Sequence, residues 1–318
     1  MSLSDDLKSK ILKKKKKIGE YIENPKITLI MQFFNHGNIV DLHSKRIKKN
    51  ALIEEVIICE DGSSDNSLEL WHKNLDRRND IIIRTNDYHE LISYNRAAQY
   101  AIGEYLCFCQ DDDLLPANNI WLQNALSLFE KDSKLGMIGF ISCDEFKSNN
   151  DIFNERSSGR EWYATDKLIR TTGLTIKTKL NDINFKYTCA TVIGPVIIKK
   201  KIFHEIGGWS SEFSQPGQPA IGLDWDISFK CWEHGYRVGC MPLKLAEEDE
   251  YENNEILNDD KFYYRYGFRG TIEINNEVRS AQFKKNIKIL HHKLNSIDVN
   301  FVSKIYNNVK MLNSKLDI

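Results

Sequence analysis

The sequence contains no long uninterrupted run of apolar residues, and its N-terminus lacks the apolar core of a signal peptide. Its apolar runs are shorter than the roughly 20 residues that a membrane-spanning helix needs. Neither sign of charge dominates, since the formal net charge is -1. Nothing in the overall charge therefore favours nucleic-acid binding. We expect a soluble cytoplasmic protein with no nucleic-acid partner.

Cysteine is scarce as well, with seven residues in a chain of 318. The number is odd and the spacing matches no disulfide framework. Cys107 and Cys109 share a strand face, but no second cysteine pair or nearby histidine pair completes a zinc site. We expect reduced and mostly buried thiols. With 41% hydrophobic and 28% charged residues, the chain can form a full core in one large domain or two small ones.

What the sequence does contain is a regular alternation of short apolar segments with helical patterns. The expected strands cover residues 27–34, 54–59, 81–83, 105–109, 137–142, 192–198 and 237–241. The expected helices between them end near residues 49, 77, 101, 129, 206 and 234. Strands that are apolar on both faces, separated by helices, are typical of a parallel sheet covered by helices. The predicted fold class is therefore α/β, with a mostly parallel central sheet flanked by helices.

Three segments fall outside this alternation. Residues 1–24 are polar and basic, with consecutive lysines at 13–17, and form either a solvated arm or a contact with an anionic membrane surface. Each lysine close to lipid would contribute about 1 kcal/mol to that contact. Residues 144–186 are weakly periodic and are expected to pass over the active-site face. The helical pattern of residues 280–318 predicts an appendage that either packs on the core or forms a homodimer.

These boundaries give three regions. We expect a basic arm over 1–24, a catalytic domain over 25–250 and a helical extension over 251–318. The catalytic domain divides into a half that binds the nucleotide over 25–143 and a half that binds the acceptor over 144–250. Residues 210–222, rich in Gly, Pro, Gln and Ser, are expected to form a loop of the second half.

The most informative stretch is the apolar strand 105–109, which runs through Gln110 into Asp111, Asp112 and Asp113. Ligands of open α/β sheets lie at the carboxyl ends of the strands, where these aspartates follow. Adjacent carboxylates repel one another unless a cation lies among them. Carboxylate oxygens suit Mg²⁺ or Mn²⁺, which proteins often hold with one or two carboxylates plus substrate phosphates. A solvated acidic turn is the alternative, and the buried strand favours the metal site.

Two further acidic patches, Glu60-Asp61 and Asp224-Trp225-Asp226, follow the same order along the chain. The matching stretches are ITLIMQFFN, EVIICEDGSSD, NDYHELISYNRAAQYAIGEYLCFCQDDDLLP, GPVIIKKKIFHEIGGW and GLDWDISFKCWEHGYRVGCMP. Together they resemble a glycosyltransferase of the GT-A fold, similar to glycosyltransferase family 2. The resemblance covers about residues 26–245.

This resemblance implies a site for a nucleotide sugar, UDP-linked by default. Its nucleoside pocket would be lined by Phe33, Phe34, Asn35 and Glu60. Asp61 would accept a hydrogen bond from the ring N–H of the base, and Asp111 would reach the ribose hydroxyls. Asp112 would bind the divalent metal, Mn²⁺ or Mg²⁺, directly, and Asp113 would support it through water. Arg96 either adds positive charge towards the diphosphate or is a surface arginine of its helix.

The resemblance also implies an acceptor side. Asp224 matches the residue that acts as general base towards a sugar hydroxyl, with inversion at the anomeric carbon. The alternative role for Asp224 is to cap the following helix. Asp226 would orient the acceptor or the base. Trp209 and Trp225 could offer an apolar face to a sugar ring, although core packing is the default for a tryptophan.

The sequence departs from the family pattern in two places. Gln110 stands where the family often has Asp, which removes one negative charge. Many relatives place a metal-binding histidine after the last core strand, whereas residues 245–249 here read LAEED. Either Glu247 or Glu248 replaces that histidine, or the metal keeps more water.

The resemblance thus predicts an inverting, metal-dependent transferase acting on a glycan, a lipid-linked or a protein-linked acceptor. Peripheral membrane contact through the basic arm is the alternative to a solvated arm. A sugar nucleotidylyltransferase would need a Gly-rich basic loop after the first strand, and QFFNHGN provides none. A phosphohydrolase of the DxDxT kind fits less well, because EDGSSD follows the second strand. A catalytically silent scaffold with the same fold is the alternative from another class.

Overall fold

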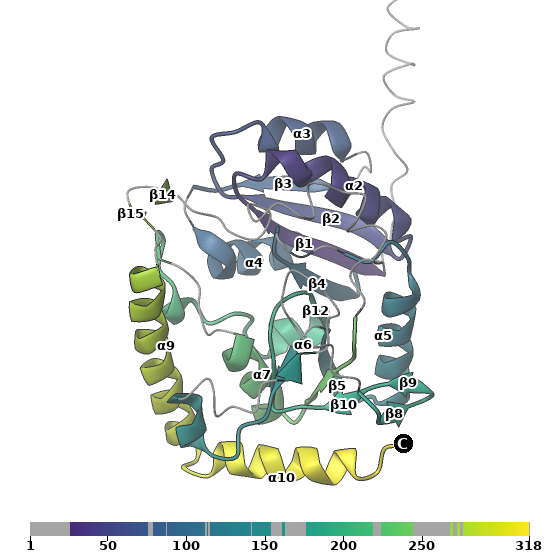
Figure 1. The fold of residues 1–318 in the computed structure, drawn as a ribbon, viewed down its shortest axis with the longest axis vertical. Coiled ribbons are helices and arrows are strands. Elements are labelled where there is room, and N and C mark those ends of the chain that lie inside the picture. The colour runs from purple at the N-terminus through teal and green to yellow at the C-terminus, as the bar shows by residue number, and fades with distance from the viewer. Residues whose placement is uncertain are drawn as a thin grey trace, which may run out of the picture.

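The computed structural model centres on an eight-stranded sheet with the strand order β10-β13-β5-β12-β4-β1-β2-β3 (Figure 1). Its strands are β1 (Ile27–Phe33), β2 (Ile53–Glu60), β3 (Ile81–Arg84), β4 (Tyr105–Cys109), β5 (Leu135–Gly139), β10 (Lys186–Tyr187), β12 (Val196–Lys199) and β13 (Arg237–Cys240). The structure describes residues 26–75, 79–86, 88–111, 113, 115–140, 142–153, 161–162, 176–218, 224–243, 268–269, 272–273 and 276–317.

The sheet is mostly parallel, which confirms the predicted fold class. β1 pairs in parallel with both β2 and β4, and β2 with β3, so these strands end at one edge of the sheet. β12 is the exception at the centre, because it runs antiparallel to both of its neighbours, β4 and β5. β10 also pairs antiparallel, with β13 at the far edge. The apolar pattern predicted β12 at residues 192–198, but it carries no information about strand direction. It did not predict β10, because a strand of two residues is too short to show a period.

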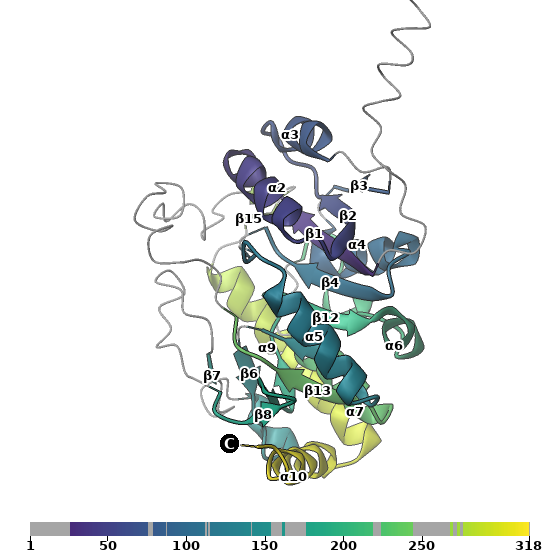
Figure 2. The same ribbon diagram turned by 90° about the vertical axis from the view of Figure 1, so that its right-hand side faces the viewer.

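Helices cover both faces of this sheet (Figure 2). They are α2 (Val40–Lys49), α3 (Ser67–Asn74), α4 (His89–Tyr100), α5 (Ile120–Lys131), α6 (Lys200–Glu205) and α7 (Asp224–Glu233). Because side chains alternate along a strand, β4 packs on helices from both faces. Tyr105 stacks on Phe129 of α5 at 5.1 Å between ring centroids. On the opposite face, Phe108 lies 5.1 Å from Tyr94 of α4 and 5.2 Å from Phe203 of α6.

Several short strands lie outside the central sheet, and the sequence did not predict them. β6 (Ser142–Asp144) pairs with β11 (Ala190–Thr191) and with β7 (Glu161–Trp162). β8 (Lys179–Leu180) and β9 (Ile183–Asn184) form a hairpin, as do β14 (Phe268–Arg269) and β15 (Ile272–Glu273). Strands of two or three residues are too short to show a period. Residues 154–160 and 163–175 of the expected excursion lie outside the described residues.

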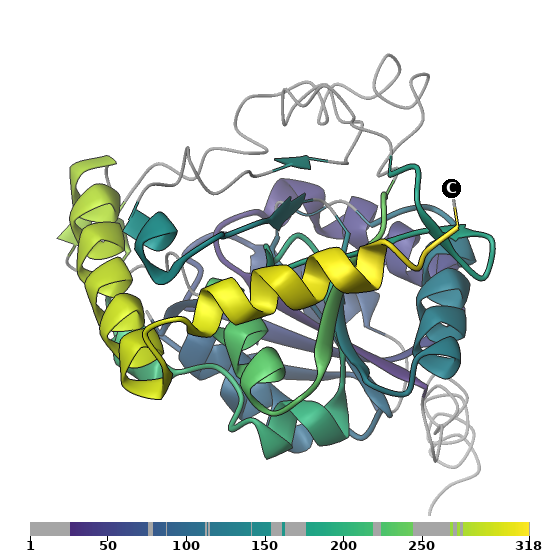
Figure 3. The ribbon, with the colours of Figure 1, turned by 90° about the horizontal axis from the view of Figure 1, so that it is seen from below.

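The C-terminal helices α9 (Asn276–Ile297) and α10 (Phe301–Asn313) pack on the rest of the fold. α9 runs along one flank and α10 crosses beneath the sheet (Figures 1 and 3). Their buried apolar side chains join the main core: Ile287, Leu290, Leu294, Val302, Ile305, Val309 and Leu312. Asn313 also exchanges two hydrogen bonds with the backbone of Tyr187, at 2.8 and 2.9 Å. Packing on the core is thus the alternative that the structure shows, and a homodimer stays a prediction.

The described helices include none that is both long and apolar enough to span a bilayer. The basic residues 1–24 lie outside the described residues, so their membrane contact stays a prediction. The division at residues 143 and 250 also stays a prediction.

All seven cysteines are buried and none is in a disulfide, as expected from their odd number and spacing. Burial raises the pKa of the Cys189 and Cys231 thiols to about 12, because the thiolate would lose its hydration. Since the thiolate is the reactive form, we expect Ellman's reagent to modify none of the thiols in the native protein. In denaturant it should modify all seven. Rapid modification of a native thiol, read at 412 nm, would contradict this packing.

Candidate active site

The ends of β1, β2 and β4 converge at one edge of the sheet, where Asp61 follows β2 and Asp111 follows β4. The end of β1 contacts both aspartates. The Asp61 N–H donates to the Phe33 carbonyl at 3.0 Å, and the Phe34 N–H donates to Oδ2 of Asp111 at 2.9 Å. Asp61 is 1% exposed and Asp111 is 0% exposed. The structure therefore brings together two of the three acidic patches that the sequence identified.

The Asp61 carboxylate accepts hydrogen bonds from four donors among the described residues. Its Oδ1 accepts from the Thr85 hydroxyl and the Tyr88 N–H, each at 2.8 Å. Its Oδ2 accepts from the His89 N–H at 3.0 Å and from the Gln32 amide at 3.2 Å. A carboxylate offers about four lone-pair positions. A base N–H that donates to Asp61 would therefore have to replace one of these donors.

Two residues beside Asp61 have left-handed backbone conformations without being glycine. Asn35 has φ 51° at the end of β1, and His89 has φ 56° at the start of α4. This conformation costs a side-chain-bearing residue about 1–2 kcal/mol. Hydrogen bonds hold both residues in place: His89 through Asp61, and Asn35 through its N–H to the Ser63 hydroxyl at 2.9 Å. The sequence did not identify His89 as part of the site, because left-handed histidine has no sequence signal.

The remaining predicted nucleoside residues differ in accessibility. Phe33 is 0% exposed and packs on Trp71 at 5.3 Å, so its ring belongs to the core beneath the site rather than to a pocket wall. Phe34 is half-buried and Asn35 is exposed. Glu60 is fully buried, where Oε1 accepts from the Ser63 N–H at 2.5 Å and Oε2 lies 3.3 Å from the Arg84 guanidinium. Its contacts shape the turn that carries Asp61.

Two buried histidines contact Asp111, and sequence reasoning missed both. The Nε2 atom of His43 lies 2.8 Å from the Asp111 carbonyl oxygen. The Nδ1 atom of His36 lies 3.5 Å from Oδ2 of the Asp111 carboxylate. His36 follows Asn35 directly at the end of β1, and that position was the available signal. One imidazole therefore contacts the backbone of Asp111 and the other contacts its carboxylate.

The rest of the acidic motif forms a tight turn. Oδ2 of Asp113 accepts from the Gln110 N–H at 2.6 Å. The Gln110 amide in turn donates to Oε1 of Glu90, on the first turn of α4, at 3.2 Å. A carboxylate from α4 thus lies next to the position where the family often has one. Asp112, the expected metal ligand, lies outside the described residues.

Within the described part of the chain, no group of three or more His, Cys, Asp or Glu side chains could hold a metal ion. Asp111 and Asp113, the neighbours of Asp112 in the sequence, are nevertheless both buried carboxylates. Oxygen ligands of this kind fit Mn²⁺ or Mg²⁺, which need only one or two carboxylates when substrate phosphates and water complete the shell. Glu247 and Glu248, the expected replacements for the family's histidine, lie outside the described residues.

Arg96 is exposed on α4. It follows Glu90 by six residues, which is about 9 Å along a helix axis and about 120° away around it. Glu90 contacts the acidic turn, so Arg96 lies down the helix and away from that turn. This placement corresponds to the surface-arginine alternative.

On the acceptor side, Asp224 is the first residue of α7 and is half-buried. Its carbonyl oxygen accepts from the Ser228 hydroxyl at 2.8 Å. Asp226 is 3% exposed, and its carboxylate accepts from the Ser210 hydroxyl at 2.5 Å and from the Lys293 ammonium at 2.9 Å. Asp226 therefore contacts α9 rather than an open acceptor surface.

The structure places the two expected sugar-stacking tryptophans in the core. Trp225 is 1% exposed; its indole N–H donates to Oδ2 of Asp144 at 2.7 Å and its ring packs on Phe146. Trp209 is 2% exposed and packs on Phe108 at 5.6 Å. Neither ring has a face open to an acceptor. Core packing, the default for these residues, is what the structure shows.

The backbone at Trp209 is fixed by α4. The Asn95 side chain accepts from the Trp209 N–H at 2.9 Å and donates to the Trp209 carbonyl at 2.7 Å. Gly208 precedes it with φ +60°, and a Cβ there would lie 2.6 Å from Oδ1 of Asn95. The left-handed turn predicted at Gly207-Gly208 is confirmed, and it brings the chain from α6 against α4.

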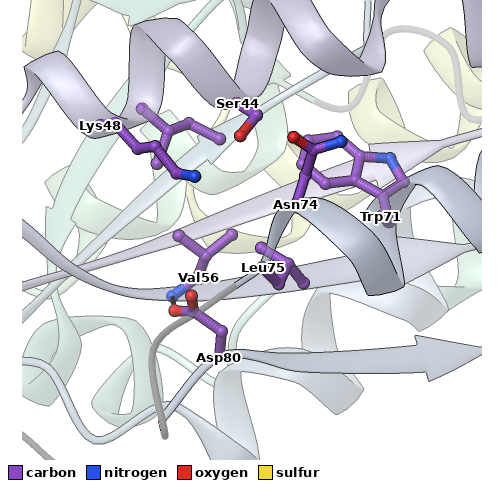
Figure 4. Close-up of a pocket in the computed structure, with 8 residues that line it drawn as sticks. Ser44, Lys48, Val56, Trp71, Asn74, Leu75 and Asp80 are labelled. Carbon is purple, nitrogen blue, oxygen red and sulfur yellow. Dashed lines mark hydrogen bonds between the residues drawn. The ribbon is translucent and has the colours of Figure 1, made fainter. Parts of the chain in front are cut away.

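A small pocket lies between α2, α3, β2 and the segment before β3 (Figure 4). Its lining residues are Ser44, Ile47, Lys48, Val56, Trp71, Asn74, Leu75 and Asp80. A cavity volume of about 10 Å³ leaves room for a single water molecule at most. This pocket is therefore not a substrate site.

Comparison with known proteins shows which family the chain matches. The model of the family described as glycosyl transferase family 2 matches residues 28–207. UDP-Glc:alpha-D-GlcNAc-diphosphoundecaprenol beta-1,3-glucosyltransferase WfgD of Escherichia coli is 26% identical over 170 residues. That alignment covers 51% of this chain and 64% of the relative, so the chain spans less than two thirds of the relative's length.

Solved structures of low sequence identity are also similar. A mannosyltransferase from Pyrobaculum calidifontis in complex with GDP-Man and Mn²⁺ is 13% identical, with 96% of this chain and 86% of that chain covered and a TM-score of 0.44. TarS 1-349 of S. aureus in complex with UDP-GlcNAc is 14% identical, with 89% of this chain and 79% of that chain covered and a TM-score of 0.46.

Proposed function

Because the chain belongs to glycosyl transferase family 2, we propose that it moves a sugar from a nucleotide-sugar donor to a hydroxyl group of an acceptor. The observation that carries the proposal is the convergence of β1, β2 and β4 around the buried carboxylates of Asp61 and Asp111. Buried carboxylates at the carboxyl ends of parallel strands lie where ligands of open α/β sheets bind.

The proposed donor is a UDP-sugar. Support for uridine comes from the sequence relative, whose name specifies UDP-Glc, and from Asp61, which would accept from the ring N–H of uracil. To do so, the Asp61 carboxylate would give up the hydrogen bond from Thr85, Tyr88 or His89 and accept one from the base instead. Phe34 and Asn35, the accessible residues after β1, would contact the nucleoside, and Asp111 the ribose.

A divalent metal, Mn²⁺ or Mg²⁺, is the proposed cofactor. Asp112 would bind it directly and Asp113 would act through water, with the donor phosphates as further ligands. When bound, such an ion neutralises charge on the leaving nucleoside diphosphate. The chain's own contribution is to fix the two neighbours of Asp112, since Asp111 accepts from the Phe34 N–H and Asp113 accepts from the Gln110 N–H.

Asp224 is the proposed general base. A sugar hydroxyl is a weak nucleophile, and a carboxylate that takes its proton in the transition state accelerates attack about 10²–10⁴-fold. Attack from the face opposite the diphosphate would invert the anomeric carbon. Because the carbonyl of Asp224 rather than its side chain accepts from Ser228, the helix start does not need the carboxylate for that contact.

We propose a glycan or another hydroxyl-bearing acceptor, either lipid-linked or protein-linked. The sequence relative is named for a diphosphoundecaprenol-linked acceptor, which supports a lipid-linked substrate here. An acceptor of that kind would bring this chain to a membrane surface. The five lysines at 13–17 would then add electrostatic attraction.

Thermal unfolding with nucleotides tests the donor site. A ligand at 100 times its dissociation constant stabilises a fold by about 2.7 kcal/mol, which raises the melting temperature measurably. We expect stabilisation by UDP or one UDP-sugar, but only with Mn²⁺ or Mg²⁺. If only another nucleotide stabilised the protein, the proposed transferase activity would stand but its donor would carry that nucleotide instead of UDP. If no nucleoside diphosphate or nucleotide sugar shifted the transition, the silent scaffold would be the better description.

A further inference from the structure

Helix α7 has two polar faces that contact different parts of the fold. Residues two positions apart are separated by about 200° around a helix, and residues four apart lie on one face. Asp224 and Ser228 share the first face, where the Ser228 hydroxyl also receives the Thr191 N–H of β11 at 3.2 Å. Asp226 and Lys230 share the opposite face. The direction in which Asp224 points is therefore coupled to the contacts of Asp226 and Lys230.

Those contacts are with the turn after α6 and with α9. The Lys230 ammonium donates to the Gly208 carbonyl at 2.6 Å, and Asp226 accepts from the Ser210 hydroxyl. The Lys293 ammonium, from α9, lies 2.9 Å from Oδ1 of Asp226. The side chain of Asp226 is 4% exposed, so Lys293 supplies the countercharge to a buried carboxylate.

Lys293 contacts the same turn at further points. Its ammonium lies 2.8 Å from Oε1 of Glu212, 3.2 Å from the Ser210 hydroxyl and 5.1 Å from the ring centroid of Phe213. About three turns earlier on α9, the Gln282 amide donates a further hydrogen bond to the Phe213 carbonyl at 2.8 Å. Although burial disfavours its charged form, the carboxylates of Asp226 and Glu212 raise the pKa of Lys293. Lys293 therefore carries its charge at neutral pH.

We propose that Lys293 is a positioning residue for the acceptor half of the site. Through Asp226 it fixes the rotation of α7, and with it the direction of the Asp224 carboxylate. Through Glu212 and Ser210 it fixes the turn that leads towards α7. The inference rests on the proposed role of Asp224 as general base. It makes α9, from the C-terminal extension, a part of the site rather than an appendage.

Kinetics of Lys293→Met and Lys293→Arg test this role, with Lys288→Met on the exposed side of the same helix as the control. An error of about 1 Å in a reacting group can lower a rate 10²-fold. For Lys293→Met we expect kcat for transfer to fall about 10–100-fold, with the KM for the donor and the release of nucleoside diphosphate without acceptor unchanged. Lys293→Arg should restore most of kcat, and Lys288→Met should match the parent.

Loss of the ion pair also leaves Asp226 buried without its countercharge, so stability must be separated from positioning. In Lys293→Met/Asp226→Asn both charges are removed. We expect this double variant to recover the melting temperature of the parent but not its kcat. Recovery of both, or an unchanged kcat in folded Lys293→Met, would overturn the positioning role.

Hydrogen–deuterium exchange provides a test that does not depend on activity. In Lys293→Met we expect faster exchange of the amides at 228–231, the first in α7 that donate to carbonyls within the helix, with β4 unchanged. Unchanged exchange at 228–231 would overturn the proposal whether or not the chain transfers sugar. An absence of transfer by the parent protein, together with faster exchange, would instead refute the proposed function and leave the contact between α9 and α7 established.

Discussion

Asp224→Asn is expected to abolish sugar transfer while donor binding persists. Asparagine has the shape of aspartate but cannot accept the proton of the attacking hydroxyl. The loss should approach the full contribution of a general base, about 10²–10⁴-fold in kcat. The substitution keeps the carbonyl of residue 224, so the hydrogen bond from the Ser228 hydroxyl should persist.

The measurement is single-turnover transfer, with nucleotide affinity determined in parallel. Glu233→Gln is the matched control, since it removes one carboxylate from the exposed last turn of the same helix. The control should transfer at the parent rate. If Asp224→Asn also transferred at that rate, the base would have to be another residue. Weakened UDP binding in Asp224→Asn would instead place residue 224 on the donor side.

The central fold could be predicted from the sequence because its strands are buried on both faces. The expected strand at 105–109 has the bounds observed for β4, and the glycines at 207 and 208 end α6 in left-handed conformations as expected. The direction of β12 could not be predicted. A buried strand is apolar whichever way it runs, and the long connection before it permits both directions.

The sequence could predict only those site residues that directly follow the end of a predicted strand. Asp61 and Asp111 follow the ends of parallel strands, so the topology alone brings them to the same edge. The partners of the aspartates in both halves of the site come from distant segments. His89 lies 28 residues beyond Asp61 on the donor side, and Lys293 lies 67 residues beyond Asp226 on the acceptor side. Such contacts depend on tertiary packing and leave no local pattern.

For Trp209 and Trp225, too, the local sequence did not determine whether the side chain lies in the site or in the core. An indole ring suits a sugar face and a protein core equally well, because both are apolar surfaces that accept a flat ring. The neighbours decide between them. For Trp225 they are Asp144 and Phe146 of another strand and loop, which its own sequence context does not specify.

Asp112→Ala is expected to abolish the metal-dependent part of nucleotide binding. Asp111 and Asp113 each have one carboxylate oxygen in a hydrogen bond with a backbone N–H, of Phe34 and Gln110 respectively. Those two residues therefore support the fold around the turn, and the family resemblance assigns direct contact with the metal to Asp112. Without that ligand, we expect the affinity for UDP in Mn²⁺ to fall about 100-fold, which corresponds to about 2.7 kcal/mol.

The same variant should be at least as stable as the parent when no metal or nucleotide is present, because it removes one of three carboxylates that repel each other. Titration calorimetry with UDP, with and without Mn²⁺, measures the first effect, and thermal unfolding measures the second. Asp113→Asn is the control, since it changes the neighbouring charge and disturbs the hydrogen bond to Gln110. It should lower stability and weaken binding less than Asp112→Ala does. Equal UDP affinity of Asp112→Ala and the parent in Mn²⁺ would show that the metal is held without Asp112, and Glu247 and Glu248 would be the next candidates.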